Sequence, residues 1–250
     1  MLLWISSLDA MAEPSPNLHE ILFLDIETVP GSPDWNVLSE RVRELWKDKS
    51  AFYRERHGLE LEESYDRAGI YAEFGKVVCI GVGYFHRGRE GEQLRITSFH
   101  HEQEEVLLKE FADFLHRVTG NPFRLLCAHN GKEFDFPYLC RRLIIQGIGL
   151  PRMLRIAGMK PWEVPHLDTM DMWKFGDYKH FTSLTLLAEV LGVPDSKDDI
   201  NGSQVGQVYW KEQDLDRIAR YCEKDVLALA RVYQRLTGHA AVADDQVVFA

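Results

Sequence analysis

Apolar runs alternate with amphipathic segments along most of this chain, which is typical of a mixed α/β domain. Continuous apolar runs predict five strands, at 21–26, 76–86, 93–100, 124–129 and 164–168. The glycine-flanked segment 88–91 predicts a hairpin turn between the second and third strands. Apolar residues at helical spacing predict four helices, at 104–118, 135–147, 184–191 and 214–236.

An insertion from residue 30 to 75 separates the first two predicted strands. It contains an amphipathic segment, 35–57, in which basic residues are interleaved with Trp46, Phe52 and Tyr53. Aromatic rings of this kind can stack on the bases of a single strand, or they can form the core face of a helix. Both interpretations stay open from the sequence.

Composition limits the possible classes of protein. A chain of 250 residues with 45% hydrophobic residues can form one domain with a large core, and we expect that domain at 20–237. The net charge of −10 argues against a tight, sequence-specific DNA binder, but not against an enzyme that holds a few terminal nucleotides. Basic residues such as Arg141 and Arg142 are interpreted as solvated helix faces.

The two ends of the chain look different from its middle. Residues 1–19 form an extension without the basic leading segment of a signal peptide, and Met11 is a candidate start. Residues 238–250 are small and acidic, and we expect a tail that is frayed or packs late. No apolar segment approaches the ~20 residues of a membrane span, and the four cysteines make no CxxC pair. These features predict a cytoplasmic protein with free thiols and no membrane partner.

Three short acidic clusters carry the candidate chemistry. Asp25 and Glu27 stand two residues apart on the first strand and therefore share a side. Asp135 follows the fourth strand, and Tyr221 and Asp225 stand four apart on the last helix. Four carboxylates that converge from three elements repel one another unless a cation neutralises them, and oxygen ligands suit Mg²⁺ or Mn²⁺. The clusters predict a two-metal phosphodiester hydrolase.

The order and spacing of these clusters resemble the ExoI, ExoII and ExoIII motifs of the DEDD 3′–5′ exonucleases. The pattern D-x-E, N-x(3)-F-D and Y-x(3)-D is matched by 25–27, 130–135 and 221–225. The histidine subgroup has its base five residues before the last aspartate, where this chain has Arg220, so the match is to the tyrosine subgroup (DEDDy). Over residues 20–237 the chain most resembles stand-alone bacterial proteins related to the exonuclease domain of family B DNA polymerases.

This resemblance implies a ribonuclease-H-like (DnaQ-like) fold, with a mixed five-stranded sheet ordered 3-2-1-4-5, strand 2 antiparallel, and flanking helices. It implies a magnesium-dependent nuclease that uses two Mg²⁺ or Mn²⁺ ions and acts on single-stranded 3′ ends, of DNA rather than RNA. The expected process is DNA repair or proofreading, in which the protein acts alone or beside a polymerase or repair protein. It makes Asp25, Glu27, Asp135 and Asp225 metal ligands and Tyr221 a catalytic residue. It assigns substrate contacts to Ile26, Thr28, Asn130, Phe134 and Lys197.

Two other functions remain open from the sequence. One is an RNA-directed exonuclease of the ribonuclease-D type, because both reactions share their phosphodiester chemistry and differ at the 2′-OH. The other is a non-catalytic adaptor with the same fold, although such a protein is expected to have lost a carboxylate. Asp168 and Asp171 lie near the fifth strand, where turn or capping roles are favoured over metal binding.

Overall fold

The structure is a computed structural model that describes residues 16–88, 91–120, 122–177, 179–194 and 200–250. The predictions for residues 1–15 and for Lys197 lie outside this range. The described residues form a six-stranded mixed sheet. Its strands are β1 (Ile21–Pro30), β2 (Gly75–Gly88), β3 (Gly91–His100), β4 (Leu125–Ala128), β5 (Leu167–Asp168) and β6 (Val247–Phe249).

The strand order confirms the predicted ribonuclease-H-like arrangement. It reads β5-β4-β1-β2-β3-β6, which is the expected 3-2-1-4-5 order with one more strand beside β3. β1 pairs antiparallel with β2 and parallel with β4. β2 and β3 form the predicted hairpin, with Gly88 opposite Gly91. β1 therefore lies near the middle of the sheet, and β5 is much shorter than the predicted strand 164–168.

The sixth strand shows that the tail at 238–250 is packed against the sheet and not frayed. β6 pairs in parallel with β3, and Val242 is buried. The Val242 amide donates to Gln234 Oε1 at 2.9 Å, and Arg231 Nη2 lies 2.5 Å from Asp244 Oδ1. Without β6, β3 would be an edge strand with unpaired backbone groups, and the tail covers its middle part, from Leu94 to Ile96. The acidic composition of the tail gave no sign of this pairing.

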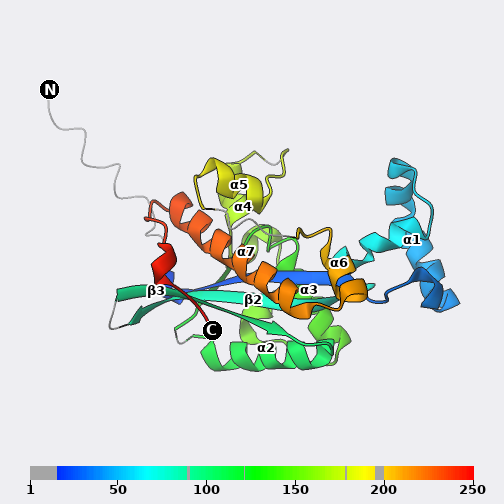
Figure 1. Ribbon diagram of the computed structural model, residues 1–250, viewed down its shortest axis with the longest axis horizontal. Coiled ribbons are helices and arrows are strands. Elements are labelled where there is room, and N and C mark those ends of the chain that lie inside the picture. The colour runs from blue at the N-terminus through cyan, green and yellow to red at the C-terminus, as the bar shows by residue number, and fades with distance from the viewer. Residues whose placement is uncertain (1–15, 89–90, 121, 178, 195–199) are drawn as a thin grey trace.

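Helices cover both faces of the sheet (Figure 1). The helices are α1 (Glu40–His57), α2 (Glu104–Val118), α3 (Asp135–Ile145), α4 (Thr169–Lys174), α5 (Leu184–Val190), α6 (Val205–Gln207) and α7 (Leu215–Leu236). The chain also forms a 3₁₀ segment, η3 (Glu63–Ile70), and a π-helical turn, η6 (Val208–Glu212). In the described part of the chain, no helix has the length and apolarity to cross a bilayer.

The alternation along β1 decides what lies on each face. Leu22 and Leu24 pack with α2 and α3 in one core, whereas Ile21 and Phe23 pack with α7 in another. Asp25 follows Ile21 and Phe23 at the same two-residue spacing, so its carboxylate lies on the face of the sheet that α7 covers. α7 approaches this face closely, since a Cβ at Gly81 of β2 would lie 2.8 Å from Val226 Cγ2.

The insertion folds as a small unit at the end of the sheet where β1 finishes (Figure 1). Trp46 of α1 is fully buried against the rings of Tyr65, Tyr71 and Phe74, so it belongs to a local core. Phe52 is 76% exposed, and Tyr53 is half-buried. The core-face interpretation therefore holds for Trp46 and does not hold for Phe52.

Candidate nuclease site

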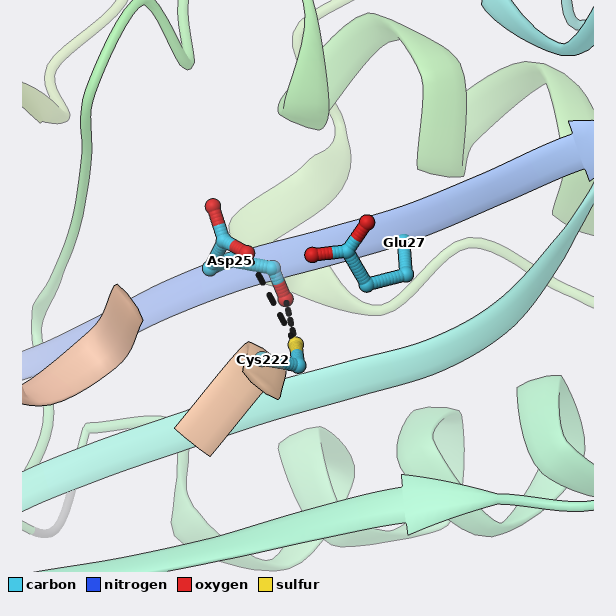
Figure 2. Close-up of side chains that lie close together, drawn as sticks. All are labelled: Asp25, Glu27 and Cys222. Atoms are coloured by element: carbon cyan, nitrogen blue, oxygen red, sulfur yellow. Dashed lines mark hydrogen bonds between the residues drawn. The ribbon is translucent and has the colours of Figure 1, made fainter. Parts of the chain in front are cut away.

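β1 carries the first two acidic residues of the site. Asp25 and Glu27 project from alternate positions of the strand to the side of α7, as predicted (Figure 2). Glu27 is only 7% exposed, and Asp25 is half-buried. The register of β1 and β2 shifts just after Glu27, which is opposite Cys79, and such bulges are common beside active sites.

The thiol of Cys222 lies directly beside the two carboxylates (Figure 2). Its Sγ is 3.6 Å from both Asp25 Oδ2 and the Asp25 carbonyl oxygen, and ligand atoms of Asp25, Glu27 and Cys222 lie within 4.8 Å of one another. Burial raises the pKa of the Cys222 thiol well above its usual range, so the thiol stays protonated and donates to Asp25. The sequence analysis missed this contact. Cys222 stands three residues before Asp225, and that helical spacing was a usable signal.

The predicted carboxylates also act on one another electrostatically. Burial, then the charges of Asp225 and Asp135, raise the pKa of Asp25 well above its usual range. Burial, then Asp25 and Asp225, raise the pKa of Glu27. Asp135 is 4% exposed at the start of α3, and burial raises its pKa to about 7, although the Ile26 amide donates to it and opposes the shift. The carboxylates of three elements therefore share one electrostatic environment.

Tyr221 adds a hydroxyl to this environment from α7. Burial and the charge of Asp225, one turn further along α7, raise its pKa far above 10. Its O–H donates a hydrogen bond to Asp225, which also favours the protonated phenol. Tyr221 is thus a neutral hydrogen-bonding group at neutral pH.

The loop after β4 is held by Asp168, which the sequence analysis assigned to capping. Asp168 is buried at the start of α4 and accepts from the amides of Met170 and Asp171. It also accepts from the amides of Asn130, at 2.9 Å, and Lys132, at 3.1 Å. Asn130 has a left-handed backbone with φ 64°, and its buried Oδ1 has no hydrogen-bond partner among the described residues. This loop delivers the chain to α3 and so positions Asp135.

An open cleft of about 520 Å³ runs beside Glu27. Three of the predicted substrate-contact residues line it: Ile26, Thr28 and Phe134. The opposite walls come from the insertion and from a segment of small residues just before α6. One of these, Gly202, is adjacent to the site, since a Cβ there would lie 4.0 Å from the Tyr221 hydroxyl oxygen. The side chain of Asn130 is not among the cleft-lining groups.

The donor set of this site fits a hard divalent cation. Burial alone makes several ionised carboxylates unfavourable, and a bound cation supplies the compensating charge. Carboxylate oxygens are the ligands that Mg²⁺ and Mn²⁺ prefer, whereas a protonated thiol is a poor ligand for either ion. The fit therefore rests on Asp25, Glu27, Asp135 and Asp225, with Cys222 as their neighbour.

The sheet order and the placement of the helices define a ribonuclease-H-like exonuclease fold. Residues 70–247 match the model of a family described as predicted 3′–5′ exonucleases related to the exonuclease domain of PolB, and the chain belongs to this family. The matched residues include Asp135, Tyr221 and Asp225 and end at Val247, the first residue of β6, and they begin after Asp25 and Glu27.

One solved structure is similar to this chain over part of its own length. It is the family B DNA polymerase from the hyperthermophilic archaeon Pyrobaculum calidifontis, with 17% sequence identity and a TM-score of 0.49. The match covers 90% of this chain and 28% of the polymerase chain.

Proposed function

We propose that this protein is a two-metal-ion 3′–5′ exonuclease of the DEDDy type. It removes terminal nucleotides from single-stranded nucleic acid, DNA in preference to RNA, as 5′-mononucleotides. The observation that carries the proposal is the set of buried carboxylates, with raised pKa values, gathered beside Tyr221 and an open cleft. A fold without catalytic use for these groups gains nothing from holding several carboxylates so close together, because each raises the cost of ionising the others.

In this proposal Asp25, Glu27, Asp135 and Asp225 hold two Mg²⁺ or Mn²⁺ ions, which when bound activate water and neutralise the charge that develops on the phosphate and the leaving oxygen. Asp25 and Glu27 keep their places because β1 is fixed between β2 and β4. Asp135 keeps its place through the loop that Asp168 holds.

Tyr221 positions the attacking water. Its hydroxyl hydrogen is used by Asp225, which leaves the phenol oxygen free to accept a hydrogen bond from water. Because its pKa is raised, Tyr221 orients this water without removing its proton. The water oxygen forms a bond to the terminal phosphorus and gives up a proton to solvent, and the bond from phosphorus to the 3′ oxygen of the preceding nucleotide breaks while that oxygen takes up a proton from solvent. The products are a 5′-mononucleotide and a chain shortened by one.

The test uses a 5′-labelled single strand as DNA and as RNA of the same sequence, with Mg²⁺, with Mn²⁺ or with EDTA. We expect a ladder of shortening labelled products from the DNA with either metal, and none with EDTA. Asp216→Asn is a matched control, because its side chain is 81% exposed on the same helix as Asp225. Protein that stays inert on both strands with both metals would contradict the proposal and favour an adaptor.

A further inference from the structure

Part of the cleft is lined by residues of the insertion, which supplies none of the four proposed metal ligands. We propose that Arg67, held by Tyr53, forms a subsite for the nucleotides upstream of the cleaved phosphate, and that this subsite selects single-stranded ends. The inference rests on the proposed exonuclease function and specifies the form of its substrate.

Arg67 and Tyr53 meet on the wall of the cleft. The Arg67 guanidinium lies 4.7 Å from the centroid of the Tyr53 ring, and that ring lies 4.5 Å from the ring of His57. Both Arg67 and Tyr53 line the cleft that Glu27 lines. Arg67 is exposed, so its planar group can stack on a base while its N–H groups donate to the neighbouring phosphate. Tyr53 is a positioning residue, because it fixes the plane of the guanidinium.

The segment that carries Arg67 is fixed to the rest of the molecule. Trp46 Nε1 donates to Ser64 Oγ at 3.0 Å and joins α1 to η3. The Tyr138 hydroxyl of α3 donates to the Gly69 carbonyl at 2.7 Å. Gly69 also lies against β1, since a Cβ there would be 2.9 Å from the Val29 carbonyl carbon. A group on this wall therefore has a defined position relative to Glu27.

The charges around the cleft explain why a single strand is favoured. Among its described lining residues Arg67 is the only basic one, whereas Glu27, Glu63 and Asp66 are acidic. One phosphate backbone can follow Arg67, but the second backbone of a duplex would meet Glu63 and Asp66, which are not among the proposed metal ligands. The wall facing the insertion includes Gly202, Ser203 and Gly206, whose small side chains leave room for one strand and lead to Tyr221.

Binding of a 5′-fluorescein-labelled 12-residue oligothymidylate, measured by anisotropy in EDTA across a salt series, tests the subsite without turnover. We expect Arg67→Ala to weaken binding about tenfold, as loss of a stacking contact does. The slope of log affinity against log salt should become shallower by about 0.7, the value for one phosphate contact on a single strand. Arg67→Lys should keep the slope and lose affinity, because its charge remains and its planar group is gone.

Two controls separate the subsite from general effects. Arg56→Ala removes an exposed arginine of α1 that is not among the cleft-lining residues, and it should bind like the parent. Tyr53→Phe should keep the affinity and Tyr53→Ala should lower it, because an aromatic ring is what holds Arg67. If Arg67→Ala matches the parent in affinity and slope, the subsite is wrong.

A kinetic comparison distinguishes failure of the subsite from failure of the proposed function. The ratio of kcat/KM for the 12-residue strand to that for a thymidine dinucleotide should fall in Arg67→Ala, through KM rather than kcat. A parent that hydrolyses both substrates, with the same ratio in the variant, overturns the subsite and leaves the function. A parent that binds the strand through Arg67 and hydrolyses neither substrate overturns the function and leaves the subsite.

Discussion

Carboxylates at two places in this molecule have opposite kinds of neighbours. Glu104, at the start of α2, is almost fully paired: Arg142 Nε donates to its Oε1 at 2.8 Å, and Arg142 Nη2 donates to its Oε2. Gln146 and the Val77 amide complete the set at 2.8 and 2.7 Å. On β1, Asp25 and Glu27 have carboxylates and a thiol as neighbours, and their pKa values are raised.

The difference teaches how structural and functional charge can be told apart. At Glu104 the protein itself supplies the cation and the donors, so the group joins α2, α3 and β2. At Asp25 the neighbouring carboxylates add to the cost of ionisation and the Cys222 hydrogen bond opposes them only in part, so a bound cation would supply the charge that favours the ionised form. Burial is common to both places, and only the partners differ.

The largest effect should come from removing a carboxylate of the site. We expect Asp25→Ala or Asp225→Ala to reduce turnover at least 10³-fold, because the metal ligands are lost. The melting temperature should hold or rise, because removing one of several crowded carboxylates relieves repulsion in the metal-free protein. Nuclease assays and thermal melting in EDTA measure the two effects. Retained activity in Asp25→Ala would show that the site is assigned wrongly.

The converse change at the paired carboxylate should damage the fold. Arg142→Met leaves Glu104 buried without its cation, and losing one partner of a buried pair costs about 3–5 kcal/mol. Urea denaturation measures the loss, and Arg141→Met is the control because Arg141 is exposed. We expect the folded fraction of Arg142→Met to keep its catalytic rate. If Arg142→Met has the same unfolding free energy as the parent, the pairing of Glu104 is not structural and the contrast with Asp25 and Glu27 is wrong.

This pair also shows what the sequence could not predict. The sequence favours a solvated face for most of its basic residues, Arg141 and Arg142 among them, yet Arg142 is buried against Glu104, 38 residues away. No local spacing predicts which of two adjacent arginines faces a distant helix. The same reason explains why β6 was missed, because its pairing with β3 joins segments about 150 residues apart.

The features of the site that the sequence predicts are those set by the spacing of residues close together in the chain. Asp25 and Glu27 share a side of a strand, and Tyr221 and Asp225 share a face of a helix, so periodicity alone places each pair. The family resemblance supplied the sheet order, which the structure confirms over five strands. Lys197 stays a prediction, because it lies outside the described residues. The catalytic roles of Asp25, Glu27, Asp135, Tyr221 and Asp225 also stay predictions until the variants are assayed.

A smaller change tests the hydroxyl beside the carboxylates. Tyr221→Phe removes one oriented hydrogen bond to the attacking water, and such a loss costs about 10²–10³ in rate. Mn²⁺ affinity, measured by calorimetry, should stay near that of the parent because the ring still occupies its place on α7. The competing interpretation is that Tyr221 is a packed aromatic residue. A variant as fast as the parent would support packing and exclude the positioning role.

The smallest effect should be a pH dependence confined to the site. Asp135 has an ordinary pKa of 3.8 and a folded-state pKa of about 7, so between these values the unfolded chain releases a proton that the folded protein keeps. Stability therefore falls as pH rises from about 4 to about 7, and the loss persists above this window. The half-buried His129 and the buried His166, whose pKa values are lowered by desolvation, act in the opposite direction below pH 6.5.

The comparison therefore has to be made between parent and variant. Melting in EDTA at pH 5, 6, 7 and 8 should show a smaller decline for Asp135→Asn than for the parent, because the histidines contribute equally to both. Added Mg²⁺ should raise the melting temperature of the parent more at pH 8 than at pH 5, since the ligands bind metal in their ionised form. If the difference in melting temperature between parent and variant stays constant with pH, Asp135 titrates like an ordinary aspartate. The electrostatic contrast between Asp135 and Glu104 would then be wrong.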